Sequence, residues 1–362
     1  MEYLLFLGIL MYYLNENVKN LNRIFDQNSR ENYLRMDLNE NPNGLPIEFI
    51  REVLSTVDVE LISKYPEHLE FTQKLGKMIG AEVNQICLTN GSAEAIRHII
   101  EAYSRPGGKI LSVAPSYAMY GVYAEMYGRE HVTVEYDDNF NINVDDIIAK
   151  ITPDIDLVIV LNPNNPIGDV YTYEEMDRII AAAKESEATV LIDEAYFYFY
   201  PNSFIKYALE NDHVFLTRTF SKLFSLAGCR LGYAVGQAEG IEMIQKLCTP
   251  HNVNAFGMKF AQAIMEKEGM IDELVAKQLE GKKYLVDNLR EKGYEVIANE
   301  GNFVFIKPNT DAETVVKRMK EEKRILIKFY HNIGGKGDFL RASTGEKELM
   351  QVFIDALVEI DK

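Results

Sequence analysis

The feature that most constrains the fold is an alternation of short apolar runs with helical stretches, which continues for about two hundred residues. The runs predicted to be strands are 85–88, 109–113, 131–135, 157–161, 189–192, 213–217 and 232–235. Helical patterns at 93–104, 173–185 and 203–209 lie between several of these strands. Strands that alternate with helices in this way form a mostly parallel sheet covered on both faces. We therefore predict an α/β fold whose large domain holds a mostly parallel, seven-stranded sheet.

The pattern changes from Ile241 onward to long helices, with 255–292 nearly continuous, and then to strands at 295–297, 303–307 and 325–329. A chain of 362 residues exceeds one ordinary core, so a second, smaller α/β domain is expected. No Pro- or Ser-rich linker separates the two, which favours tight packing. The predicted division is an N-terminal segment, 1–50, that joins the small domain or a dimer contact, a large domain, 51–245, and a small domain, 246–362.

The first 14 residues are almost wholly apolar, and a polar helix is expected over 15–26. The apolar run has no basic residues before it and is shorter than the roughly 20 residues that span a bilayer. It is interpreted as a helix that packs on the body or across a dimer contact, with peripheral membrane attachment as the alternative.

Charge and motif content exclude several classes of function. The net charge of −17 repels nucleic acids. Neither GxGxxG nor GxxxxGK[ST] occurs, so no nucleotide-binding fingerprint is present. Three scattered cysteines without a CxxC pair favour a reducing, cytoplasmic location, and no metal site is expected from the spacing of the six histidines.

The chemistry is concentrated at 217–232, TRTFSKLFSLAGCRLG, where Lys222 follows a strand in an apolar, Gly-bearing segment. Desolvation and a neighbouring cation lower the pKa of such a lysine and free its amine to form an imine. Thr219, Ser221 and Arg230 offer two hydroxyls and a guanidinium to one phosphate. The segment is interpreted as a phosphate cup that contains a nucleophile.

Other candidates follow the preceding strands. Asp193 ends a strand at the sheet edge where open α/β folds bind ligands, and a carboxylate there can keep a pyridine nitrogen protonated. Tyr196 and Asn165 are candidate hydrogen-bond partners of a phenolic oxygen on the same pyridine ring. The helix start at Ser92 and Ala93 can hold phosphate through backbone amides, and Tyr117 can stack on an aromatic ring. Each of these residues also has a common structural role, as a cap, turn or core aromatic.

With these residues in this order, the sequence resembles the fold-type I aminotransferases that use pyridoxal 5′-phosphate, and within them the histidinol-phosphate aminotransferase branch. The resemblance covers nearly the whole chain. The motifs that carry it occur in the family's order: NENP at 39–42, KYPE at 64–67, NGSAE at 90–94, PSY at 115–117, NPNNPIG at 162–168, DEAY at 193–196, TFSK at 219–222 and LRASTG at 340–345.

The resemblance implies a role for each candidate and an enzyme of amino-acid biosynthesis with ping-pong kinetics. Lys222 is the imine lysine and proton shuttle, and Asp193 is the pyridinium partner. Tyr65 reaches the cofactor of a neighbouring subunit, which implies a homodimer with shared active sites. The other implied contacts are to phosphate (Ser92, Ala93, Thr219, Ser221, Arg230), to the phenolic oxygen (Asn165, Tyr196), to the ring face (Tyr117) and to substrate (Arg341, Lys328, Asn41).

The substrate is less closely defined, because the family commonly has a second arginine where this chain has Lys328. The first hypothesis is amino transfer between L-histidinol phosphate and 2-oxoglutarate, with Arg341 gripping the 2-oxo acid's carboxylate. The alternatives are an aminotransferase for another amino acid, aromatic or basic, and a decarboxylase of the threonine-phosphate type. A protein that binds pyridoxal phosphate without turnover is the hypothesis from another class.

Overall fold

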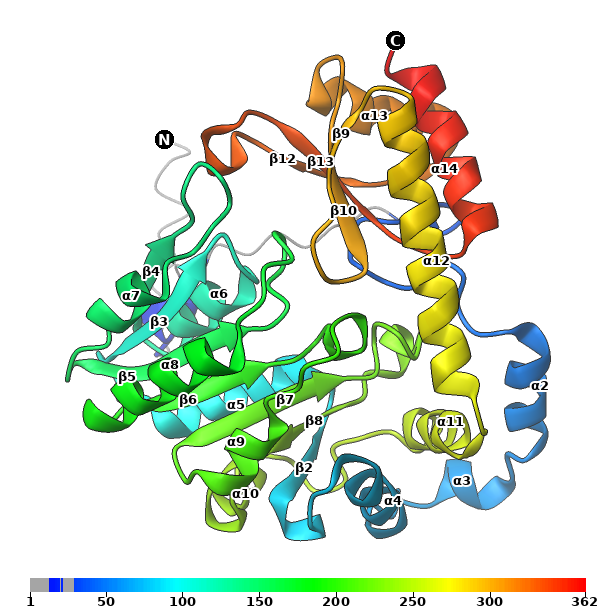
Figure 1. Cartoon of the computed structure of the whole chain (residues 1–362). Coiled ribbons are helices and arrows are strands. Elements are labelled where there is room, and N and C mark those ends of the chain that lie inside the picture. The colour runs from blue at the N-terminus through cyan, green and yellow to red at the C-terminus, as the bar shows by residue number, and fades with distance from the viewer. Residues whose placement is uncertain (1–12, 20, 22–28) are drawn as a thin grey trace, which may run out of the picture.

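The computed structural model describes residues 13–19, 21 and 29–362 (Figure 1). The apolar run predicted to pack as a helix therefore lies largely outside the described residues. Of the polar helix predicted over 15–26, residues 16–19 form α1 (Glu16–Lys19), Asn15 and Leu21 are not helical, and 20 and 22–26 lie outside the described residues. Among the described residues, no helix is both long and apolar enough to cross a bilayer.

The predicted seven-stranded sheet is present, with strand order β2-β8-β7-β6-β5-β3-β4. Its strands are β2 (Ile86–Thr89), β3 (Lys109–Ala114), β4 (Glu130–Glu135), β5 (Ile155–Leu161), β6 (Thr189–Asp193), β7 (Val214–Thr219) and β8 (Gly232–Val235). All neighbouring pairs are parallel except those of β8, which runs antiparallel to β2 and β7. The interior strand β5 is buried along its whole length, as expected for a strand covered on both faces.

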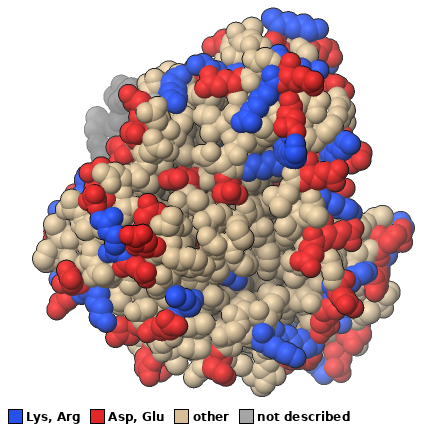
Figure 2. All heavy atoms as spheres, viewed as in Figure 1, with Lys and Arg blue, Asp and Glu red and all other residues tan. Residues whose placement is uncertain are grey.

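Helices pack against this sheet and close its core. Helix α5 (Ser92–Tyr103) contacts β2, β5, β6, β7 and β8, whereas α8 (Tyr173–Glu185) contacts β6, α9 (Ile205–Glu210) contacts β7, and α10 (Ala238–Gln245) contacts β2. The remaining helices before α10 are α2 (Ile47–Ser55), α3 (Val59–Ser63), α4 (Leu69–Ile79), α6 (Met119–Met126) and α7 (Val144–Ala149). Acidic and basic side chains are interspersed on the face that Figure 2 shows.

A second sheet is antiparallel, with strand order β12-β13-β10-β9. Its strands are β9 (Glu295–Ile297), β10 (Phe303–Lys307), β12 (Lys328–Tyr330) and β13 (Phe339–Ser343), and it packs with α12 (Met270–Glu291), α13 (Ala312–Lys323) and α14 (Lys347–Ile360). The N-terminal strand β1 (Leu34–Arg35) pairs in parallel with β11 (Ile325–Leu326), and Met36 enters the core of this unit. Residues 253–274 contribute instead to the core of the large sheet. The exact division at 245/246 stays a prediction.

Two predicted elements are interrupted in the structure. The long helix is divided into α11 (Ala255–Glu266) and α12, because Gly269 adopts a left-handed conformation with φ 72° directly before α12. The strand predicted at 325–329 is divided at Ile327, since β11 pairs with β1 and β12 pairs with β13. Figure 1 shows α12 running from beside α11 up to the small sheet, so one helix spans both units.

Candidate active site

A cavity of about 460 Å³ lies where β5, β6 and β7 end. Strands of an open parallel sheet place the residues at their carboxyl ends along one edge, which is where such folds bind ligands. The cavity is lined by Arg35, Leu38, Glu40, Ser92, Ala93, Tyr117, Leu161, Asn165, Asp193, Ala195, Tyr196, Thr219, Ser221, Lys222, Ala227, Gly228 and Arg230. The structure thus brings ten of the predicted site residues, from five separate segments, into one cavity.

Lys222 follows β7 and places its amine in the cavity. Its Nζ donates a hydrogen bond to the carbonyl of Leu38 at 3.0 Å and lies 5.7 Å from the centre of the Tyr196 ring. Burial lowers the pKa of Lys222 to about 8, and the positive charge of Arg341 acts in the same direction. About a tenth of the amine is therefore neutral at pH 7, and the neutral form is the one that a nucleophile requires.

Asp193 ends β6 and is 2% exposed. Its Oδ2 accepts a hydrogen bond from the Tyr120 hydroxyl at 2.8 Å, and its Oδ1 accepts from the Thr217 hydroxyl and from the Ala195 amide, each at 3.2 Å. Burial raises the pKa of Asp193 to about 6, while these hydrogen bonds act against the rise. The result is a fixed, buried carboxyl group that gains from a cationic partner in the cavity.

Tyr196 and Asn165 are joined by Asn39, which is buried between them. Asn39 Nδ2 donates to the Tyr196 hydroxyl at 2.9 Å and to Asn165 Oδ1 at 3.3 Å. Burial raises the pKa of Tyr196 to about 12, so this hydroxyl keeps its proton. The three polar groups therefore form one side of the cavity.

The opposite end offers donors suited to an anion. Ser92 and Ala93 begin α5, whose first backbone amides have no partner within the helix. The Thr219 hydroxyl donates to Ser221 Oγ at 2.9 Å, and Arg230 Nη2 reaches the Asn90 carbonyl at 3.5 Å. A Cβ on Gly232 would stand 2.4 Å from the Ser92 amide, so only glycine permits β8 to approach the helix start this closely.

Tyr117 lines the cavity beside Asp193, and its ring contacts that of Tyr120 edge-on at 5.4 Å. Burial raises the pKa of Tyr117 well above its ordinary value. Its aromatic face is thus held by a second tyrosine that itself hydrogen-bonds to Asp193.

Arg341 and Lys328 lie opposite each other on β13 and β12. Arg341 is 3% exposed and donates from Nη1 to Asn165 Oδ1 at 2.6 Å and to the Tyr330 hydroxyl at 3.1 Å. Lys328 Nζ lies 5.9 Å from the centre of the Tyr330 ring. Burial lowers the pKa of Lys328, with a further contribution from Arg341. Arg341 therefore stands beside the cavity and bonds to Asn165 of its wall, and Lys328 lies opposite Arg341 on the neighbouring strand.

Besides Arg341 and Lys328, two further predicted residues lie outside the cavity lining. Tyr65 is 77% exposed and stacks on the His251 ring at 4.8 Å. Asn41 donates to the Ser225 hydroxyl at 2.7 Å and accepts from Gln278 at 2.8 Å. Asn41 thus ties the loop at 39–44 to α12, and its role toward substrate stays a prediction.

Sequence reasoning missed Asn39, Tyr120 and Tyr330. Asn39 belongs to the NENP motif, yet its position depends on a left-handed backbone with φ 55°, which the sequence signals only through the tolerance of Asn for that conformation. Tyr120 lies three residues after Tyr117, and this helical spacing was the available signal. Tyr330 had no separate signal, because it aligns with Arg341 only through the pairing of β12 with β13.

The model of the family described as aminotransferase class I and II matches residues 31–357. The chain belongs to this family. Its cofactor is pyridoxal 5′-phosphate, and the cavity fits that molecule, since it contains an amine, a buried carboxyl group and a set of anion donors.

The relatives of this aminotransferase place it in the histidinol-phosphate aminotransferase branch. It is 30% identical to the histidinol-phosphate aminotransferase of Caldanaerobacter subterraneus over 353 residues, which cover 96% of this chain and 98% of that protein. It is 31% identical to the enzyme of the same name from Thermoanaerobacter pseudethanolicus over 332 residues, or 90% of this chain and 92% of that protein.

Solved structures agree with this placement. The histidinol-phosphate aminotransferase of Clostridium acetobutylicum is 28% identical, with a TM-score of 0.79 and coverage of 91% of this chain and 99% of that chain. The L-threonine-O-3-phosphate decarboxylase of Porphyromonas gingivalis shares the fold, with a TM-score of 0.75 at 22% identity and coverage of 90% of this chain and 98% of that chain.

Proposed function

We propose that this aminotransferase moves an amino group between L-histidinol phosphate and 2-oxoglutarate. The observation that carries the proposal is the meeting of Lys222 and Asp193 in one cavity beside Arg341, which bonds to Asn165 of the cavity wall. The relatives of the histidinol-phosphate branch support the choice of amino donor.

We assign each of the ten predicted cavity residues a contact with pyridoxal 5′-phosphate. When bound, this cofactor supplies an aldehyde that joins amines and a ring that withdraws electrons from the substrate's Cα. Asp193 would hold the ring nitrogen protonated, and Tyr117 would cover the ring face. The residues that would bind the phosphate are Ser92, Ala93, Thr219, Ser221 and Arg230, and those that would bind the phenolic oxygen are Asn165 and Tyr196.

Lys222 has two tasks in this proposal. Its amine would hold the cofactor's aldehyde, and once free it would take the proton from the substrate's Cα. The lowered pKa supports both tasks, because a base and a nucleophile must be neutral before they act. The Leu38 carbonyl, 3.0 Å from Nζ, orients the amine between these events.

Arg341 and Lys328 are suited to two substrates whose anionic groups differ, one a carboxylate and the other a phosphate. The Arg341 guanidinium is planar and donates from Nη1 and Nη2 to Asn165, Tyr330 and the Asp37 carbonyl, and a substrate carboxylate would replace some of these acceptors. Lys328 is more exposed and presents a point charge, which suits a phosphate. The donor and the 2-oxo acid can therefore use one cavity in turn.

A half-reaction tests the donor directly. Enzyme loaded with pyridoxal phosphate and mixed with L-histidinol phosphate, without any oxo acid, is expected to lose the visible absorbance of its cofactor as the amino group is transferred. Added 2-oxoglutarate should restore the absorbance. An unchanged spectrum with L-histidinol phosphate refutes this donor, and release of carbon dioxide from a phosphorylated amino acid would favour the decarboxylase alternative.

Substitution of the two cations separates their roles. Arg341→Gln should raise KM for 2-oxoglutarate by about 10- to 100-fold, since a hydrogen-bonded charge is lost. Lys328→Gln should raise KM mainly for L-histidinol phosphate. Equal effects of both variants on both substrates would contradict the assignment.

We further propose a homodimer with shared active sites. Six large apolar side chains over 47–69 are at least 46% exposed, a density that a free surface rarely carries: Ile47, Leu54, Val59, Ile62, Tyr65 and Leu69. Tyr65 belongs to this surface, which is consistent with a reach into the neighbouring subunit. A cytoplasmic location is also proposed, because all three cysteines are free.

Mixed subunits test the shared site. If Tyr65 acts across the interface, Lys222→Ala and Tyr65→Ala subunits are each impaired, yet a heterodimer of the two contains one intact site. Random mixing should then restore about a quarter of the wild-type sites. A failure to regain activity in a preparation shown to contain heterodimers would contradict sharing.

A further inference from the structure

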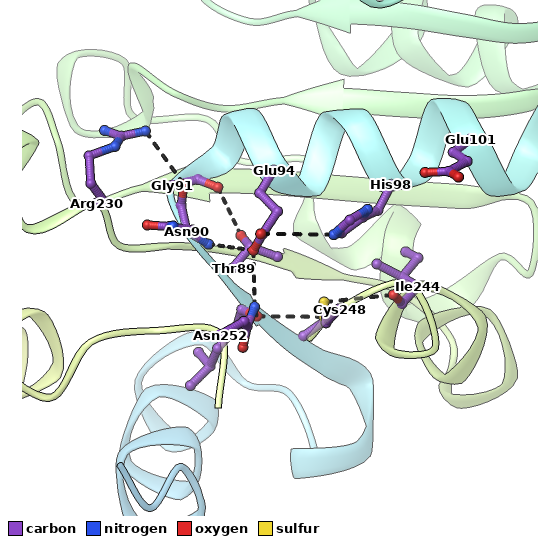
Figure 3. A network of polar contacts seen from close by, with 12 residues as sticks. Thr89, Asn90, Gly91, Glu94, His98, Glu101, Arg230, Ile244, Cys248 and Asn252 are labelled. Carbon is purple, nitrogen blue, oxygen red and sulfur yellow. Dashed lines mark hydrogen bonds and ion pairs between the residues drawn. The ribbon is translucent and has the colours of Figure 1, made fainter. Parts of the chain in front are cut away.

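A second cluster of reactive side chains lies on α5, on the side of its first turns away from the cofactor cavity. Glu94 and His98 are four residues apart and so share one face of the helix, and Cys248 follows α10 and approaches them (Figure 3). One ligand atom from each of these three residues lies within 4.8 Å of the others. None of them has a task in the reaction proposed above.

His98 is the observation that calls for a ligand. It is 4% exposed, and both of its ring nitrogens are buried without a hydrogen-bond partner. The nearest acidic atom, Glu94 Oε1, is 4.0 Å from His98 Nε2, which is too long for a hydrogen bond. A buried imidazole without a hydrogen bond on either ring nitrogen is costly, and a cation bound between these atoms would remove that cost.

The carboxylate of Glu94 is already oriented for this role. Its Oε2 accepts hydrogen bonds from the Asn90 amide at 2.7 Å and from Asn252 Nδ2 at 3.0 Å. Oε1 remains directed toward His98, as Figure 3 shows. Hydrogen bonds that fix one carboxylate oxygen and leave the other for a metal are the usual support of a ligand.

We propose that Glu94, His98 and Cys248 bind a divalent cation of the zinc class. A thiolate, an imidazole and a carboxylate together favour Zn²⁺ over Mg²⁺ or Ca²⁺, which prefer oxygen ligands. Tetrahedral Zn²⁺ places neighbouring ligand atoms roughly 3.3–3.8 Å apart, so the three atoms need to close by about 1.5 Å at most. Cys248 is partly exposed and Glu94 is long, and both can make this movement.

Charge balances at the site when Cys248 binds as the thiolate. The Cys248 S–H proton leaves to solvent, the S–metal bond forms, and the thiolate and the Glu94 carboxylate neutralise the two positive charges without any change of oxidation state. Cys87 Sγ lies 3.7 Å from Cys248 Sγ and can complete the coordination, or water can do so.

An entry route exists beside the cluster. Cys87, Cys248 and Asn252 line a cavity of about 400 Å³ that is separate from the cofactor cavity. The ion would also steady the turn before α5, because Asn90 bonds to Glu94 through its amide and to Arg230 through its carbonyl.

Cobalt uptake by the enzyme loaded with pyridoxal phosphate tests the proposal. After dialysis against a chelator, one equivalent of Co²⁺ should produce thiolate-to-cobalt charge-transfer absorbance, and Zn²⁺ should displace it. Cys248→Ser should abolish this absorbance, and His98→Gln should weaken binding at least about 100-fold. Cys229→Ser, which removes a thiol outside the cluster, is the matched control and should bind as the wild type does.

A milder variant protects the test against misfolding. Asn252→Ala keeps all three ligands and should weaken Co²⁺ binding by about 10-fold, because it releases the Glu94 carboxylate. Zn²⁺ should raise the melting temperature of the wild type and leave that of Cys248→Ser unchanged. Absence of charge-transfer absorbance at stoichiometric Co²⁺, or equal absorbance in Cys248→Ser, overturns the proposal. The proposal is also overturned if Cys87 and Cys248 form a disulfide and the protein still takes up no Co²⁺ after that disulfide is reduced.

Discussion

The two walls of the active-site cavity differ in how firmly their polar groups are held. On the wall built by the large sheet, Asp193 has three hydrogen bonds and Tyr196 is fixed by Asn39. On the side of the small sheet, Arg341 is also buried and held by hydrogen bonds to Asn165, Tyr330 and the Asp37 carbonyl, whereas Lys328 is exposed. The difference indicates that the cofactor's chemistry depends on rigid groups, whereas the exposed Lys328 can still adapt to a substrate.

The largest effect is expected from the lysine of the rigid wall. Lys222→Ala should reduce amino transfer at least about 10³-fold, because it removes both the attachment point and the base. Borohydride reduction of the loaded wild type, followed by peptide mapping, should find the cofactor label on Lys222.

Lys282 provides the matched control. Burial lowers its pKa to about 8 as well, yet its Nζ donates to the Gly301 carbonyl at 2.8 Å, away from the cavity lining. The Lys282→Ala variant should still carry the cofactor label on Lys222 and should keep its activity. Label on Lys282 in the wild type would show that a low pKa alone, and not the cavity, selects the lysine.

The acid of the same wall should have the next largest effect. Asp193→Asn removes the negative charge expected to face the cofactor ring and should lower kcat by about 10²–10³-fold while the protein stays folded. Steady-state kinetics and thermal unfolding measure the two properties separately.

The neighbouring Glu194 sharpens that test. It is also buried, but it pairs with Arg218 at 2.7 Å and does not line the cavity. Glu194→Gln should therefore cost about 3–5 kcal/mol of stability, since it leaves a buried guanidinium without its partner, and should leave the cofactor's spectrum unchanged. A spectral change in Glu194→Gln without one in Asp193→Asn would reverse the two assignments.

The smallest effect is expected from the charge of Arg341 on the pKa of Lys222. In the enzyme without cofactor, the rate of capture of the aldehyde by Lys222 should rise with pH through about 8, because only the neutral amine attacks. Arg341→Met removes a positive charge that disfavours the ammonium form, so the pKa of Lys222 should rise and the midpoint should move to higher pH, by less than about one unit. An unmoved midpoint would mean that burial alone sets this pKa.

The large sheet and its lysine were predictable because their signals are local. Short apolar strands, a carboxylate at the end of β6 and a lysine after β7 can each be recognised within a few residues of sequence. Their convergence followed from the parallel topology, since strand ends meet at one edge.

Other features depend on pairing between distant segments. The division at Ile327 arises because β1, about 290 residues earlier, takes β11 away from the small sheet. The side chain of Asn41 is engaged by Ser225 and Gln278, which no local pattern announces. His98 reads as one polar residue on an apolar helix face, and only the approach of Cys248 gives it a context.

The close approach of Gly232 to the Ser92 amide restricts which substitutions this protein can accept. Any side chain there would push β8 away from the Ser92 amide, so a survey of every substitution at this position should recover glycine alone among functional clones. Lys328 sits on an open strand and tolerates replacement without such a collision. Substitutions that change substrate preference can therefore accumulate on the small sheet, while the residues at the helix start beside β8 stay the same.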